Sequence, residues 1–172
     1  WILEARELVP VLAADAEPLD RSGEFAANAF ERLRDRRLMS MLVPAALGGG
    51  GATHAEACAV LAELAHGCPS TSLALSMHTH LVAAQVWRYH RGLPAPVLAR
   101  VAADELVLVS TGASDWIDSG GTATRVDGGF RIRGRKAPSS GSPAGDVLVT
   151  SARWEAGPDG PQAIHPSVPF AA

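Results

Sequence analysis

Two closely spaced histidines are the first residues in this sequence whose chemistry calls for an explanation. His78 and His80 lie two residues apart in a segment with a helical pattern, so their rings would leave a helix on different faces. A zinc-binding pair on one helix needs i, i+4 spacing, as in H-E-x-x-H. We therefore expect no metal site here. One ring should be buried, and the other should face a groove.

Two serine-containing loops are the next candidates. Ser114 precedes Asp115, and Ser139 and Ser140 precede Gly141. Hydrolases of the α/β type place their nucleophile in a G-x-S-x-G turn, and neither loop has that pattern. Serine, aspartate and glycine are also common turn residues. Taken alone, these serines favour ordinary turns over a hydrolase.

Four consecutive glycines, at 48–51, raise the question of a phosphate-binding loop. A P-loop needs Lys and then Ser or Thr directly after its last glycine, and a dinucleotide loop needs a preceding strand. Here Ala52 follows, and residues 30–43 have helical spacing. We interpret the glycines as a turn between helices. Thr53, with Glu56 three residues later, predicts a capping box at the start of the next helix.

Composition excludes several classes of protein. The net charge of −3 gives no basic surface for nucleic acid. The two cysteines, Cys58 and Cys68, are too few and too far apart for a disulfide framework or a Cys-rich metal site. No apolar run is long enough for a membrane span, and no signal peptide opens the chain. We expect a cytoplasmic protein without a nucleic acid or membrane partner. Because residue 1 is Trp and the last residues lack a closing element, we also expect a fragment.

The hydrophobic periodicity changes once along the chain. Up to residue 104 it is helical, and from Glu105 on it alternates as in strands. This order predicts an α+β fold, with an all-α domain at 1–104 and an antiparallel β domain at 105–172. The 70–90 segment is apolar on nearly all sides, so we expect it to be buried. The expected helices are 2–16, Ser22 to about Met41, 53–66, 70–90 and 95–104; the expected strands are 105–111, 122–126, 130–135 and 146–152, with a hairpin turn at 127–129.

Read in order, these segments resemble the acyl-CoA dehydrogenase superfamily. "LVPAALGGGG", followed by a capped helix and "AVLAELAHGCPSTSLALSMHTHLV", is similar to its N-terminal helical domain. "STGASD" at 110–115 takes the place of the family's "TEPGAGSD" loop, and "GRKAPSSGSPAGDVLVTSA" at 134–152 takes the place of "GxKxWITN" and the strand after it. The resemblance covers essentially the whole chain. It implies an incomplete antiparallel β-barrel as the second domain, with the family's C-terminal helical domain absent.

The resemblance also implies a cofactor, a substrate class and a site. The cofactor would be FAD, with FMN as the alternative, and the substrate an acyl-CoA. The family forms homodimers or homotetramers. Its catalytic base comes from the C-terminal domain, so no catalytic residue can be named in this chain. Positions that contact flavin in the family fall on Ser110, Thr111, Pro138, Ser139 and Ser140, and a substrate-contacting position falls on Ser114.

Two departures from the family pattern bear on the chemistry. The first loop is two residues shorter and lacks Glu-Pro, and Pro138 stands where the family has a flavin-stacking Trp. The "SSG" at 139–141 resembles the "K-x-F-x-S-G" version found in flavin-dependent monooxygenases of the same fold. Three functions remain open. The resemblance puts first an acyl-CoA dehydrogenase that oxidises the α,β-bond of an acyl-CoA thioester and transfers a hydride to flavin. The alternatives are a monooxygenase of the same fold that uses reduced flavin and O2, and a non-catalytic binding fragment.

Overall fold

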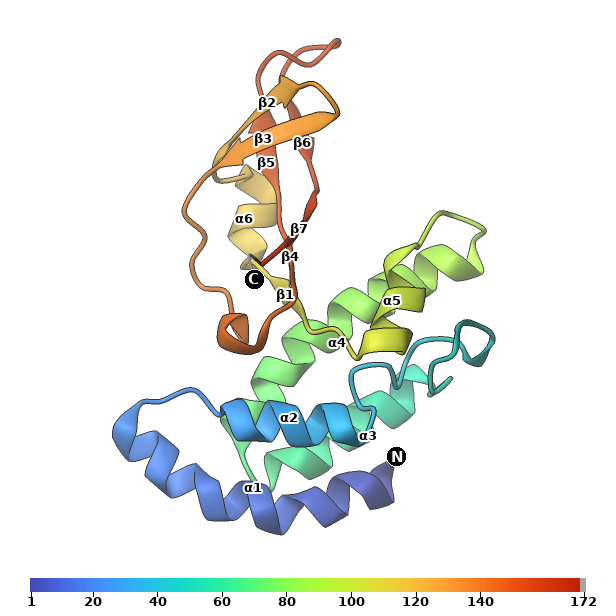
Figure 1. Ribbon diagram of the computed structural model, residues 1–172, viewed down its shortest axis with the longest axis vertical. Coiled ribbons are helices and arrows are strands. Elements are labelled where there is room, and N and C mark those ends of the chain that lie inside the picture. Colours follow the sequence, from blue (N-terminus) through green and yellow to red (C-terminus); the bar gives the residue numbers. More distant parts are fainter. Residues whose placement is uncertain (171–172) are drawn as a thin grey trace.

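A layer of helices and a region of strands make up the computed structural model, which describes residues 1–170 apart from the side chains of Ala113, Ser114 and Asp118. Figure 1 shows the strands above the helices, with β1 reaching down to α4. The division into helices followed by strands is confirmed. The helices are α1 (Ile2–Ser22), α2 (Ala27–Asp35), α3 (His54–Ala65), α4 (Pro69–His90), α5 (Val97–Asp104) and α6 (Ala113–Asp118), with short 3-10 helices η1 (Ala45–Leu47) and η2 (Ser142–Ala144). The strands are β1 (Leu108–Ser110), β2 (Thr122–Val126), β3 (Gly129–Arg133), β4 (Val147–Val149), β5 (Ala152–Trp154), β6 (Gln162–Ile164) and β7 (Ser167–Pro169).

The strands form two small mixed sheets. Their orders are β1-β4-β7 and β3-β2-β5-β6. The β2–β3 hairpin has the expected turn, but β1 pairs with β4, and β2 with β5, in parallel. The expectation of a purely antiparallel region was therefore wrong. Long excursions separate the partners in both parallel pairs, and such connections permit parallel pairing. The expected strand at 146–152 is divided between the two sheets, as β4 and β5.

The second helix differs from its expected bounds. Ser22 does not cap it but ends α1, and α2 begins at Ala27. The helix stops at Asp35 instead of near Met41. Shortly after its end, Arg37 has a positive φ of 55°, a left-handed conformation that a right-handed helix cannot continue through. Helical spacing in the sequence beyond this point therefore does not correspond to a helix.

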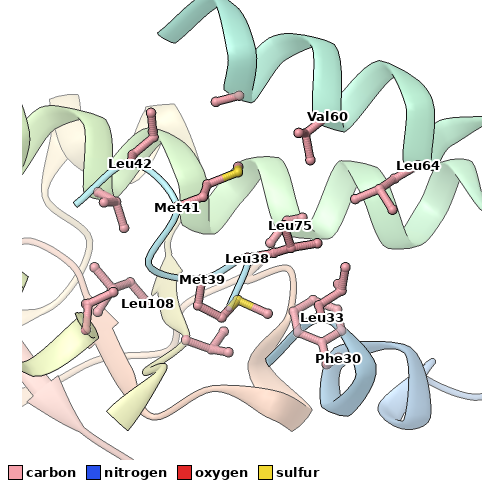
Figure 2. Close-up of a cluster of buried hydrophobic side chains, with 14 of the residues drawn as sticks. Phe30, Leu33, Leu38, Met39, Met41, Leu42, Val60, Leu64, Leu75 and Leu108 are labelled. Atoms are coloured by element: carbon pink, nitrogen blue, oxygen red, sulfur yellow. The ribbon is translucent and has the colours of Figure 1, made fainter. Parts of the chain in front are cut away.

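The chain after α2 passes through the centre of the core. Residues 38–43 are all buried although they form no helix or strand, and Figure 2 shows several of them between α2, α3, α4 and β1. Buried backbone groups need partners. The glycine segment supplies three of them: Gly50 N donates to Ser40 O (3.0 Å), Gly51 N to Val43 O (2.8 Å), and Ala52 N to Met41 O (2.8 Å).

These backbone contacts explain the run of glycines. A Cβ added to Gly49 would lie 2.3 Å from both the Cβ and the carbonyl O of Val43. Such a distance is shorter than atoms can approach, so position 49 needs glycine to lie against the buried segment. The chain at 44–51 runs between α2 and α3. The interpretation of the glycines as an interhelical turn is therefore confirmed.

Helix α3 begins with the expected capping box. The Thr53 hydroxyl accepts a hydrogen bond from Glu56 N (3.2 Å), and the Glu56 carboxylate accepts one from Thr53 N (2.7 Å). The hydrogen bonds from the backbone and side chain of Thr53 lower the pKa of Glu56. Both exposed amides at the start of the helix are satisfied in this way.

Replacing Thr53 with Ala should lower the unfolding free energy by about 0.5–2 kcal/mol, because the substitution removes the acceptor for Glu56 N. Thr53→Ser is the matched control, since it keeps a capping hydroxyl and should stay close to the wild-type value. Urea unfolding followed by circular dichroism measures both. Equal stability of the Ala variant and the wild type would contradict a stabilising role for the cap.

Helix α4 is buried along one side only, which corrects the expectation for residues 70–90. Leu75, His78 and Val82 are buried, whereas Leu73 is 64% exposed and Trp87 is 53% exposed. Many small side chains make the sequence apolar all round, but only one face meets α3 and β1. The expected division between the two histidines is confirmed, because His78 is buried and His80 is exposed. Among the helices in the described residues, none combines the length and apolarity needed to cross a membrane.

Candidate functional site

The two serine-containing loops lie in contact with each other. The first loop leaves the end of β1 at Ser110, and the second follows β3. A methyl group added at Gly112 would lie 3.6 Å from Cδ of Pro138, an ordinary van der Waals separation. Ser110 and Thr111 are buried, and Pro138 is exposed. The sequence-based expectation that these loops meet is thus met by the geometry, while their contact with a flavin stays a prediction.

The hydroxyl groups of the site differ in their partners. Thr111 Oγ1 donates to the Asp115 carboxylate (2.6 Å), so this hydroxyl is already engaged. Ser139 Oγ is buried and has no hydrogen-bond partner in the described part of the chain. Ser140 is exposed, and the side chain of Ser114 lies outside the described residues. Of the predicted site residues, Ser139 therefore has the hydroxyl most in need of a further partner.

A cavity of about 370 Å³ opens beside the second loop. Ser140 and Gly141 form one side of it, and the segment between α1 and α2 and the first turns of α4 form the others. Gly141 has a positive φ of 82°, and a methyl added to it would lie 3.8 Å from the Phe30 ring. The loop is thus seated on α2. Phe25, Thr71 and Ala74 also line the cavity.

An ion pair holds the bases of the two loops. Lys136 Nζ lies 2.5 Å from Asp115 Oδ1, and the two side chains are only 9% and 15% exposed. Burial acts to raise the pKa of Asp115, but hydrogen bonds from Lys136, Thr111 and Thr150 outweigh it and lower the pKa to about 2. Asp115 is therefore ionised throughout the range in which a protein of this kind would work.

Two further contacts fix the strands to the helices beneath them. Arg34 on α2 donates to Asp146 (2.8 Å) and to the Ala144 carbonyl (2.8 Å). His78 on α4 accepts from Leu108 N at Nδ1 (2.9 Å), so its Nε2 carries the proton and donates to Met39 O (2.9 Å). Burial lowers the pKa of His78 to about 4, which keeps the ring neutral.

Sequence reasoning missed the residues that support the site, namely Asp115 and Lys136. One signal was available: 14 of the 15 basic residues are Arg, and Lys136 is the exception. In a chain that otherwise uses Arg for its basic residues, a single Lys suggests that position 136 needs an ammonium group. The resemblance also matched Asp115 to the last residue of "TEPGAGSD" and Lys136 to the Lys of "GxKxWITN", but no sequence pattern paired the two residues.

The helices of this chain match a known family. Residues 4–91 match "Acyl-CoA dehydrogenase, N-terminal domain", which is just over half of the chain. The chain belongs to the acyl-CoA dehydrogenase family. The match ends before β1, so the two loops of this acyl-CoA dehydrogenase family chain lie outside it.

Two relatives are similar to this chain beyond the helices, in the region of the strands as well. The isobutylamine N-hydroxylase of Streptomyces viridifaciens is 31% identical over 160 residues, which cover 87% of this chain and 40% of that protein. The benzylmalonyl-CoA dehydrogenase of Aromatoleum aromaticum is 28% identical and is covered to 39%, with 83% of this chain aligned. The chain therefore spans about two fifths of the length of these relatives.

Solved structures share the arrangement of helices and strands. An X-ray structure of KijD3 in complex with FMN and dTDP-3-amino-2,3,6-trideoxy-4-keto-3-methyl-D-glucose is 27% identical, with a TM-score of 0.79. The alignment covers 96% of this chain and 44% of the KijD3 chain. The α+β fold expected from the sequence is thus the fold of known family members.

Proposed function

We propose that this chain forms one wall of a flavin site and that the protein is a flavin-dependent oxidoreductase. The unpartnered hydroxyl of Ser139, in a loop that contacts Gly112, carries this proposal. By their resemblance to acyl-CoA dehydrogenases, the two loops correspond to the two segments that contact flavin in that family. When bound, a flavin supplies the capacity to accept a hydride or, in its reduced form, to activate O2.

The residues present fit such a cofactor on physical grounds. A flavin ring needs a close, flat surface and donors toward its polar edge. The first loop offers Gly112, which lies beside Pro138, and the second offers the unpartnered hydroxyl of Ser139. Ser140 lines the 370 Å³ cavity, so a ring seated here would have space for a substrate beside it. Both FAD and FMN share this ring, and the loops favour neither.

We favour monooxygenase chemistry on a small organic substrate. Pro138 stands where a dehydrogenase would present an aromatic ring, and it is exposed and cannot stack in the same way. The N-hydroxylase at 31% identity supports the same choice. The alternative is the oxidation of an acyl-CoA thioester at its α,β-bond, which the benzylmalonyl-CoA dehydrogenase supports. The catalytic base in that case would come from outside this chain.

The deciding experiment uses the protein expressed from its complete reading frame. Its visible spectrum after reconstitution with FMN or FAD tests flavin binding. Bound flavin that is reduced anaerobically and then mixed with O2 should oxidise and, with an amine or a sulfur substrate present, form an oxygenated product. Bleaching of the oxidised flavin by an acyl-CoA without O2 would instead establish the dehydrogenase alternative. We also propose that copies associate as dimers or tetramers, which light scattering on the same preparation tests.

Ser139→Ala should weaken flavin binding by up to about tenfold, because one neutral hydrogen bond contributes about 0.5–1.5 kcal/mol. Ser140→Ala should have an effect of similar size if that hydroxyl also contacts the ring. Thr124→Ala is the control, since it removes an exposed hydroxyl on β2. Flavin fluorescence titration measures all three. Wild-type affinity in both serine variants would remove these residues from the site.

A further inference from the structure

Lys136 has an unusually complete set of partners. Its ammonium group donates to Asp115 Oδ1 (2.5 Å), to Ser151 O (2.7 Å) and to the carbonyl of Gly120. An ammonium group has three donors, and here three acceptors converge on them. Two of the acceptors lie in the segment 115–120 and the third is at Ser151, so one side chain joins two segments to its own.

Asp115 is held as completely from the other side. Its carboxylate accepts from Thr111 Oγ1 (2.6 Å), Thr150 Oγ1 (3.1 Å) and Gly120 N (3.0 Å), in addition to Lys136. Ser151 Oγ donates to the backbone carbonyl of Asp115 (2.5 Å). Nearly every bonding position of the pair is used, which is the condition under which a mostly buried ion pair is well ordered.

The backbone lies close to the ion pair at Gly120 and Gly134. A Cβ added to Gly120 would lie 2.9 Å from Asp115 Oδ1, and one added to Gly134 would lie 3.1 Å from Cα of Gly121. A planar guanidinium is larger and directs its five donors in a fixed fork, so it cannot reproduce three converging bonds in this space. This accounts for the use of Lys at 136 in a chain that has Arg at its other 14 basic positions.

The pair lies where it can set the geometry of the candidate flavin site. Asp115 is three residues after Gly112, and Lys136 is two residues before Pro138, so the pair joins the two loops just beyond their contact. We propose that Asp115 and Lys136 are positioning residues, which fix the spacing of the loops at 110–112 and 138–141 and thereby the affinity for flavin. This inference rests on the proposed function, and neither residue is proposed to touch the cofactor.

The test compares Lys136→Arg, Lys136→Met and the double variant Asp115→Asn/Lys136→Met in the protein from its complete reading frame. The double variant leaves no unpaired charge, so it should fold even if Lys136→Met does not. We expect flavin affinity to fall about tenfold or more in the double variant and in Lys136→Arg, since small displacements of a supporting shell loosen a site. We also expect the visible circular dichroism of the bound flavin to change. Arg153→Met is the control, because it removes an exposed ion pair with Glu155 (2.6 Å) and should leave both measurements unchanged.

Hydrogen exchange measured without flavin separates this inference from the proposed function. Amides in 110–112 and 138–141 should exchange faster in the double variant than in the wild type, while those of α3 should not. If the wild type binds no flavin, the proposed function fails, and the exchange comparison still decides whether the pair positions the loops. Wild-type affinity and spectrum in Lys136→Arg would overturn the requirement for Lys. Unchanged loop exchange in the double variant would overturn the positioning role.

Discussion

Gly49→Ala should destabilise the protein by about 3 kcal/mol, the upper end of the range for forcing extra atoms into a packed core. The added methyl would lie 2.3 Å from the carbonyl O of Val43, and backbone cannot move aside as the end of a flexible side chain can. Relief would require the glycine segment to separate from the buried residues 40–43. That movement would break the hydrogen bonds that Gly50, Gly51 and Ala52 donate to them.

Gly129→Ala is the matched control for this substitution. Nothing lies within 4 Å of a Cβ at Gly129, and this residue has no positive φ, so the same change should alter stability by no more than about 0.5 kcal/mol. Unfolding in urea, monitored by circular dichroism, gives both values. If the two alanine variants were equally stable, the close approach at Gly49 would not be a constraint on the fold.

Acidification should remove about 3 kcal/mol of unfolding free energy between pH 6.5 and pH 4 through His78 alone. Burial lowers the pKa of this ring to about 4 in the folded protein, against 6.5 in its absence. Between these values the unfolded chain binds a proton that the folded chain does not, so stability rises with pH. The contribution is complete above about pH 6.5 and is lost as the pH falls toward 4. Below that range the carboxylate of Asp115, with its pKa of about 2, adds a further loss.

Burial and the hydrogen bond at Nδ1 both make protonation of His78 unfavourable, whereas the hydrogen bond to Met39 O favours it. Nδ1 accepts a hydrogen bond from Leu108 N. A proton on Nδ1 would turn it into a donor, so two N–H groups would face each other and the hydrogen bond would be lost. The charges near the ring oppose one another, because Arg34 and His80 disfavour the protonated form whereas Asp146 favours it. Burial is therefore the dominant cause.

Two variants test the assignment to His78. His78→Gln cannot take up a proton, so it should be less stable at pH 7 but should show a weaker loss between pH 6.5 and 4. His80→Gln, at an exposed position of the same helix, should keep most of the wild-type pH dependence, because the charge of His80 is a smaller cause of the His78 shift than burial. Urea unfolding at half-unit pH steps measures these slopes. A wild-type slope in His78→Gln would assign the acid sensitivity to other groups.

The sequence predicted those parts of the fold that depend on local patterns. Periodicity located α3, α5 and the β2–β3 hairpin, and residue types located the cap at Thr53. It did not predict the end of α2, because the buried residues after Asp35 keep a helical spacing of apolar side chains while their backbone bonds to a distant segment. The parallel pairings were missed for the same reason, since partners far apart in the sequence leave no local signal.

The candidate site was predictable in its loops and not in its support. Resemblance predicted that the loops at 110–114 and 138–141 lie close together, and Gly112 does lie beside Pro138. The Asp115–Lys136 pair brings together the segments at 115–120, 136 and 150–151, and no spacing rule relates these three segments. The Ser139 hydroxyl has no hydrogen-bond partner in the described chain, and no sequence pattern predicts this.

The buried segment after α2 has a consequence for how such a chain can be divided or recombined. Met39 and Ser40 donate their amides to Glu105, the first residue after α5, and the Met39 carbonyl is bound by the same histidine that accepts from Leu108 N. Residues 105–108, which follow the change from helical to strand periodicity at 104, thus complete the middle of the helical core. A breakpoint there would leave two buried amides without their acceptor in one daughter chain. Residues 105–108 therefore belong to the cooperative unit of the helices, and an exchange of modules that preserves folding would have to cut after them.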